Sequence, residues 1–203
     1  MLAKGVLFSR RWDYYLYFQV FVFFVICALY TCKAEDYARL LDPPPRGGLW
    51  RHGYSVLADH RDGNVNCGGQ KVQWIVNRGK CGVCGDAANG PQDHDNGGKF
   101  DERITVRRLL SGAAFNVSFI LSQNISGMLI IQVCPMHNSR EPLTEDCFKS
   151  NTLSNKEEES LQAIHVKNTQ IGKNLPHTYE LVLPRDLICE HCVLRWMFMK
   201  GEN

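Results

Sequence analysis

The chain has 203 residues with 23 Lys+Arg and 21 Asp+Glu, a formal net charge of +2. The first 34 residues hold four of the basic and one of the acidic side chains, so 19 basic and 20 acidic residues remain in 35–203. This near-neutral balance leaves no basic patch, and we expect no nucleic acid partner. Residues 35–203 are enough for one domain with a hydrophobic core.

The leader, residues 1–34, has the anatomy of a secretory signal peptide. A basic segment precedes an apolar run from Tyr14 to Thr31, and Cys32-Lys33-Ala34 places small residues at positions −3 and −1 of a cleavage site. The run is close to the length of about 17 residues that a spanning helix needs, so an uncleaved signal-anchor is the alternative. Either way the rest of the chain enters the secretory lumen. We expect an extracellular protein, bound to a membrane only if the leader is retained.

Seven cysteines follow the leader, and an oxidising compartment favours disulfides for most of them. Because seven is an odd number, one cysteine lacks a partner inside the chain. Two Cys-x-x-Cys pairs also allow a zinc site, but they lie far apart in sequence and the compartment argues against it. The pairing cannot be read from the spacing. The cysteines are Cys67, Cys81, Cys84, Cys134, Cys147, Cys189 and Cys192.

A proline-rich stretch lies just after the leader. Pro43, Pro44 and Pro45 fix φ and push the residues before them toward extended conformations, so we expect a stiff extended arm over 42–45. Gly47-Gly48 then allows a turn, and Trp50 supplies a large apolar anchor. Such an arm can hold the start of the domain in a fixed place.

The remaining pattern predicts short strands joined by irregular segments. Residues 35–100 are rich in Gly, Asn and Asp and read as loops, with one short strand around Val72–Val76. From Phe115 to Leu121 apolar and polar residues alternate, as in a half-buried strand. Together these features predict an all-β fold, an antiparallel β-sandwich. Further strand candidates are Arg103–Leu110, Met128–Cys134, Tyr179–Leu183 and Val193–Met199.

No catalytic set is visible among the residues. The sequence lacks Gly-x-Ser-x-Gly, Walker A and His-Glu-x-x-His motifs. Asp93-His94-Asp95 could hold a cation, but in its Gly-rich loop we expect it to be solvated. Asn116-Val-Ser118 and Asn124-Ile-Ser126 are N-glycosylation acceptors, and both Asn116 and Asn124 suit exposed positions.

Several blocks along the chain carry a family resemblance. They run in order from about residue 39 to residue 201, and together they resemble the animal family-15 (AA15) lytic polysaccharide monooxygenases, grouped with chitin-binding type-4 domains. The blocks are Arg39-Leu-Leu-Asp-Pro-Pro-Pro-Arg46 with Trp50, Asn66-Cys-Gly-Gly69, Gly79-Lys-Cys-Gly-Val-Cys-Gly-Asp86, Gly97-Gly98-Lys99, Pro142-Leu-Thr-Glu-Asp-Cys-Phe148 and Cys189-Glu-His-Cys-Val-Leu-Arg-Trp196.

The resemblance implies an immunoglobulin/fibronectin-like sandwich with long disulfide-linked loops and a flat surface that faces polysaccharide. It also implies a copper site, in which the amine and imidazole of an N-terminal His and a second His bind the metal. This chain departs from the pattern at both ligands. Tyr37 stands where the first His precedes Gly-Arg-Leu, and Ile125 stands where the family reads Asn-His-x-Gly. Without these imidazoles we expect no copper or other cofactor and no catalytic or metal-ligating residue.

A third departure is the end of the chain, which stops at Gly201-Glu202-Asn203 where the family continues with a Cys- and Gly-rich tail. We therefore expect 35–203 to be a C-terminally truncated chitin-binding type-4 domain, secreted, non-catalytic, and bound to chitin or a cellulose-like polysaccharide. One alternative is an active copper monooxygenase whose first and last exons are mis-assigned. The other is a glycosylated extracellular interaction protein that binds no sugar.

Overall fold

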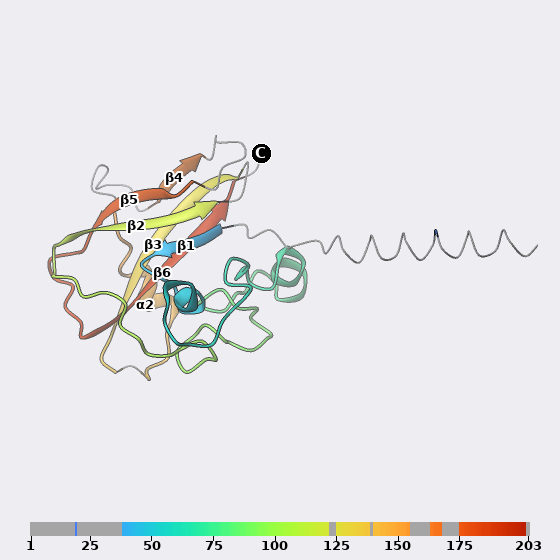
Figure 1. Ribbon diagram of the computed structural model, residues 1–203, viewed down its shortest axis with the longest axis horizontal. Helices are drawn as coiled ribbons and strands as arrows, with labels where there is room; N and C mark the ends of the chain where they lie inside the picture. Colours follow the sequence, from blue (N-terminus) through green and yellow to red (C-terminus); the bar gives the residue numbers. More distant parts are fainter. Residues whose placement is uncertain are drawn as a thin grey trace, which may run out of the picture. The chain divides into compact units, whose positions relative to one another are not determined.

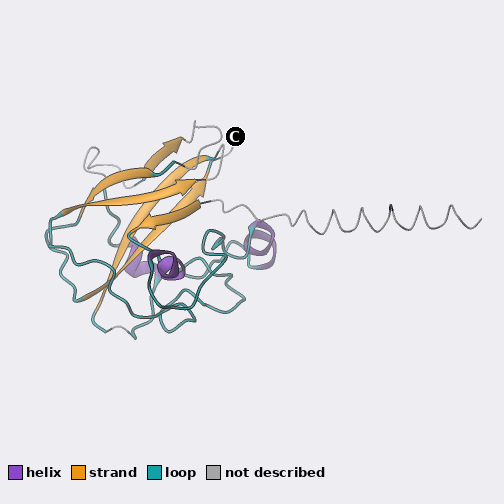
Figure 2. Cartoon of the chain, viewed as in Figure 1, coloured by secondary structure: helices purple, strands orange, loops and turns teal. Residues whose placement is uncertain are grey.

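The computed structural model describes residues 38–121, 125–138, 140–154, 163–167 and 175–201, together with Gln19. The predicted leader and the charged segment 155–162 thus lie outside the described part, apart from that one residue. Within this part the chain forms two three-stranded antiparallel sheets, ordered β1-β2-β5 and β4-β3-β6. The all-β antiparallel sandwich expected from the sequence is confirmed (Figures 1 and 2). The strands are β1 (Ala38–Asp42), β2 (Ala114–Leu121), β3 (Ser126–Met136), β4 (Ile164–Lys167), β5 (His177–Val182) and β6 (His191–Lys200).

Alternation in β2 decides which of its sides enters the core. Phe115, Val117, Phe119 and Leu121 are all buried, while the residues between them are exposed or half-buried. Because side chains alternate across a strand, one face of β2 is a continuous apolar surface. It packs with residues of the other sheet in one core cluster, whose β3 and β4 members are Leu129, Ile131, Val133 and Val166.

The strand β3 is the centre of the second sheet and pairs with β6 over ten register positions, from Gly127↔Lys200 to Met136↔His191. Near the start of this ladder the two strands approach closely. A Cβ atom on Gly127 would overlap the carbonyl oxygen of Met199, so the position requires glycine. At the other end the strand leads to the short helix α2 (Glu145–Lys149).

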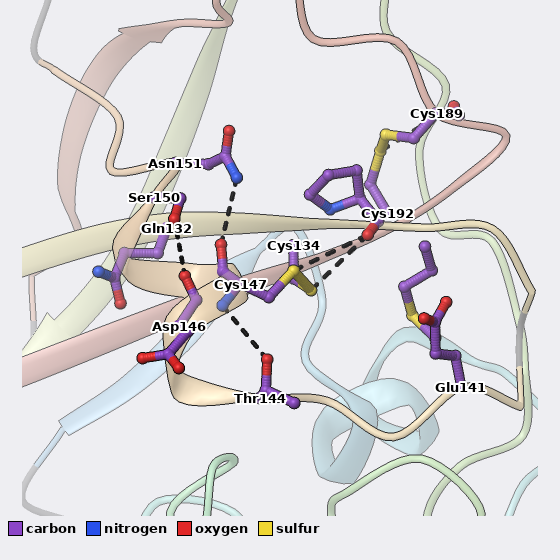
Figure 3. The surroundings of a disulfide bond; sticks show 12 residues. Gln132, Cys134, Glu141, Thr144, Asp146, Cys147, Ser150, Asn151, Cys189 and Cys192 are labelled. Carbon is purple, nitrogen blue, oxygen red and sulfur yellow. Dashed lines mark hydrogen bonds between the residues drawn. A yellow bond between two sulfur atoms is a disulfide. The ribbon is translucent and has the colours of Figure 1, made fainter.

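The helix α2 is fixed by local hydrogen bonds and by its packing. The Thr144 hydroxyl caps its first turn by accepting from the Cys147 backbone N–H, and Phe148 is fully buried. Beyond the helix, the Asn151 side-chain amide donates to the carbonyl of Cys147 (Figure 3). Five residues would not form a stable helix alone, so tertiary packing supplies the stability.

Two predicted strands are wrong. Val72–Val76 forms a turn of π-helix, η2, because a short apolar run does not by itself separate strand from helix. Arg103–Leu110 is irregular and pairs with no strand among the described residues, and most of its side chains face solvent. The strand β4, by contrast, was not predicted.

Candidate functional site

The corner that the resemblance assigns to copper lies where β1 starts and β3 starts. Ala38, the residue after Tyr37, pairs with Leu121 at the end of β2, and Ile125 directly precedes β3. Tyr37 itself lies outside the described residues. The fold therefore brings the start of the domain and the approach to β3 to one end of the sandwich (Figure 1).

Ile125 belongs to the core rather than to a metal site. Its residue surface is only 6% exposed, and an aliphatic side chain has no lone pair to donate to copper. Within the described ranges, no group of three or more His, Cys, Asp or Glu residues is arranged to hold a metal ion. The residue at this position does not fit a histidine-brace copper.

The proline-rich arm is held by side chains from distant loops. Arg107 donates to both carboxylate oxygens of Asp42, at 2.6 Å each, at the end of β1. The chain bends at Pro43, after a cis Asp42–Pro43 peptide. Pro45 is extended, so because of this bend the arm is extended only in part. The expected turn at Gly47-Gly48 is instead part of a 3-10 helix, η1 (Arg46–His52), in which both glycines are buried.

Trp50 anchors η1, as the sequence predicted. Its indole N–H donates to the carbonyl of Asp59 at 3.1 Å, and the Arg51 guanidinium lies 4.2 Å from its ring centroid. Arg51 in turn donates from two nitrogens to both carboxylate oxygens of Asp62, at 2.6 and 2.8 Å. Such two-point pairs are directional and hold the guanidinium in one orientation over the indole.

A carboxylate–imidazole–carboxylate cluster lies beneath this arm. His94 contacts Asp86 through Nδ1 at 2.8 Å and Asp59 through Nε2 at 3.0 Å. Its backbone carbonyl accepts a hydrogen bond from Arg46 at 2.8 Å. A Cβ atom on Gly47 would lie 3.0 Å from the Asp59 carboxylate and 3.2 Å from His94, so a glycine in η1 leaves space for the cluster.

This cluster changes the interpretation of Asp93-His94-Asp95. The His94 side chain is only 15% exposed and both of its ring nitrogens are engaged, so it is not simply solvated as we expected. Sequence reasoning missed the cluster because Asp59 lies between η1 and η2, whereas Asp86 and His94 lie between η2 and β2. The contacts with Asp86 and Asp59 also occupy both ring nitrogens of His94, which a cation would need as ligands.

Six of the seven domain cysteines form disulfides, and they confirm the expected framework. The pairs are Cys67–Cys81, Cys134–Cys147 and Cys189–Cys192, each between near neighbours in sequence. Within the described part of the chain the unpaired cysteine is Cys84. Burial raises the pKa of its thiol from 9.0 to about 12, which keeps it protonated and unreactive at neutral pH.

The buried Arg195 of β6 joins the second sheet to the disulfide-linked loops. It donates to Glu145 of α2 at 2.7 Å, to Gln132 of β3 at 2.6 Å and to the carbonyl of Val83 at 3.1 Å. Its guanidinium also lies 4.2 Å from the centroid of the Phe148 ring. These contacts satisfy a charged group that would otherwise be costly to bury.

The predicted glycosylation positions have different outcomes. Asn116 lies on β2 opposite Glu180 and is exposed, as an acceptor must be. Asn124 lies outside the described residues. Occupancy at both remains a prediction.

An exposed apolar cluster on η2 was not foreseen. Trp74, Ile75 and Val76 are 63%, 72% and 56% exposed. The Trp74 ring lies against Gly79, where a Cβ atom would be 3.1 Å from the indole.

No helix within the described ranges has the length and apolar character to span a bilayer.

Comparison with known proteins bears on the whole domain. A solved structure of a lytic polysaccharide monooxygenase AA15 from Thermobia domestica, in the Cu(I) state, superposes with a TM-score of 0.74. The two sequences are 29% identical, and the match covers 82% of this chain and 84% of the other. The chain resembles the AA15 lytic polysaccharide monooxygenases. A scan against protein-family models finds no match, and a search of curated proteins also finds none.

This likeness sharpens the contrast at Ile125. The structure of the Thermobia domestica AA15 monooxygenase was solved in the Cu(I) state, so that protein binds copper. This chain shares the sandwich fold and has a buried aliphatic side chain directly before β3.

Proposed function

We propose that this chain is a secreted chitin-binding type-4 domain protein that binds chitin or a related β-1,4-polysaccharide without copper catalysis. The likeness to an AA15 monooxygenase over most of both chains supports a polysaccharide ligand. The observation that carries the non-catalytic part is Ile125, a buried aliphatic residue where the family motif has its second histidine. Polysaccharide surfaces bind through stacking and hydrogen bonds, and these interactions do not require the metal.

A depletion experiment tests the binding. The protein, expressed from its full chain so that any leader is processed naturally, is incubated at micromolar concentration with crystalline chitin, with cellulose, and with neither. We expect loss of protein from solution with at least one polysaccharide. Equal protein in all three supernatants would contradict the proposal.

A parallel experiment separates binding from catalysis. The same protein is supplied with copper and a reductant, and soluble products are analysed by mass spectrometry for oxidised oligosaccharides. We expect none above a copper-only control. Oxidised products would favour the copper monooxygenase alternative, while absence of both binding and products would favour an interaction protein that binds no sugar.

A further inference from the structure

The disulfide Cys189–Cys192 differs from the other two in its position. It closes a loop with a sequence separation of 3 at the entry to β6. Cys192 is exposed, as are the two residues between the cysteines, and neighbouring Ile188 is 85% exposed. In contrast, Cys134 of the adjacent bridge is only 3% exposed (Figure 3). A thiol from solution can therefore reach Cys192 but not Cys134.

The strand β6 does not depend on this bridge for its place in the sheet. Cys192 pairs with Pro135, near the very end of the ladder between β3 and β6. The strand is held further along by buried Arg195 and by Trp196, which packs against the core. Opening the bridge frees only a surface loop, so the folded domain can exist with these two cysteines reduced.

The unpaired thiol of Cys84 is not the site at which we expect exchange with thiols from solution. Cys84 packs against the cluster of Cys134, Met136, Leu143 and Phe148, and desolvation raises its pKa to about 12. A protonated, half-buried thiol is a poor nucleophile. We therefore do not expect Cys84 to take part in thiol exchange at neutral pH.

We propose that Cys189–Cys192 is a thiol-exchange site for small-molecule thiols. A thiolate RS⁻ attacks the exposed sulfur of Cys192, the Cys189–Cys192 bond breaks, and Cys189 leaves as a thiolate that takes a proton. A second thiolate attacks the RS sulfur of this mixed disulfide and releases RSSR. Two electrons pass from two RSH to the bridge, which becomes a dithiol. His191, which lies between the two cysteines in sequence, is also exposed.

A glutathione titration tests the site. The protein from its full chain is equilibrated at graded ratios of reduced to oxidised glutathione, quenched with an alkylating reagent, and mapped by mass spectrometry. We expect Cys189 and Cys192 to be half-alkylated at a lower value of [GSH]²/[GSSG] than the other bridged cysteines, because their reduction frees only a surface loop, whereas reduction of Cys134–Cys147 disturbs a buried cluster. Cys84 should be alkylated only after denaturant is added. Half-alkylation of another bridge at an equal or lower value would overturn the proposal, as would Cys84 bonded to Cys189 or Cys192 in a non-reduced peptide map.

Two matched variants test access to the sulfur. Cys189→Ser leaves Cys192 unpaired, and we expect one glutathione adduct per folded chain when oxidised glutathione is added. Cys147→Ser leaves the buried Cys134 unpaired, and its adduct should form at least about tenfold more slowly. Equal rates in two variants with native-like circular dichroism would contradict the role of exposure. If Cys147→Ser does not fold, the titration of the unmodified protein still decides the proposal.

Discussion

Ile125 lies directly before β3, where the family resemblance predicts a copper-binding histidine. A histidine that binds copper must present its ring nitrogens, whereas Ile125 is buried and contributes apolar surface. The side chain offers no lone pair to a metal and adds apolar surface to the core. Its burial is visible only in the fold.

Truncation of Ile125 tests this structural role. We expect Ile125→Ala to lower the free energy of unfolding by about 3 kcal/mol, since it removes buried methyl groups and leaves a cavity. Urea unfolding followed by circular dichroism measures the change. Ile188→Ala is the matched control, because that isoleucine is 85% exposed and should cost less than about 0.5 kcal/mol. Equal small effects would mean that Ile125 does not belong to the core.

His177 makes the stability of the sandwich depend on pH. It begins β5, stacks on Phe119 with ring centroids 5.4 Å apart, and has its pKa lowered from 6.5 by desolvation. The unfolded chain therefore binds a proton more readily than the folded chain does. Stability should fall as pH drops through 6.5 and level off below the folded pKa.

Comparison with His177→Gln isolates this contribution. Between pH 7.5 and 5 the free energy of unfolding should decrease less in the variant than in the unmodified protein. Denaturant titration at each pH measures it. The two pH values lie about one unit or more either side of an ordinary histidine pKa. The control His52→Gln changes an exposed histidine and should keep the full slope. Parallel curves for the protein and His177→Gln would show that His177 is not the responsible group.

Loops rather than strands hold the proline-rich arm and the helix η1 that follows it. One loop contributes Asp59 and a second contributes Asp86 and His94. The helix η1 supplies Gly47 and Arg46 beside them. An imidazole has two ring nitrogens, so His94 can contact two carboxylates at once. The cluster links the arm to segments up to 48 residues away in sequence.

Removal of the imidazole should loosen these loops together. We expect His94→Ala to reduce the free energy of unfolding by roughly 3 kcal/mol, because two partly buried carboxylates lose a shared partner. Thermal and urea unfolding measure the loss, with His52→Ala as an exposed control. A change below about 0.5 kcal/mol would show that solvent replaces His94 at little cost.

For the whole molecule, the two layers and the loops differ in what stabilises them. The strands β2 and β3 each pair on both sides and supply most of the main core cluster. The segment between η1 and β2 has little regular structure and relies on a disulfide and on side-chain pairs. Local opening should therefore be frequent in this segment and rare in the central strands.

Amide hydrogen exchange measures this difference directly. We expect the slowest amides in β2 and β3, exchanging only through global unfolding, and exchange at least about a hundredfold faster in 55–110. Mass spectrometry of peptic fragments resolves the two regions. Equal protection throughout would mean that the disulfide-linked loops unfold only with the sandwich.

Much of the sandwich could be predicted from local pattern, and the failures have a physical explanation. The alternation from Phe115 to Leu121 predicted β2 because burial of one face imposes a period of two. The same reasoning failed at Val72–Val76, where a short apolar run forms η2. The local sequence pattern indicates which residues are buried and how they are spaced. It does not indicate which other segment of the chain packs against them.

By itself, the sequence determined the alternating faces of β2 and the resemblance to AA15 monooxygenases. These follow from residue identity and order. Only the tertiary structure decided the pairing of the cysteines, the two carboxylates on His94, and the burial of Cys84 beside Cys134. Each of these depends on which distant segments meet when the chain folds, and no local spacing carries that information.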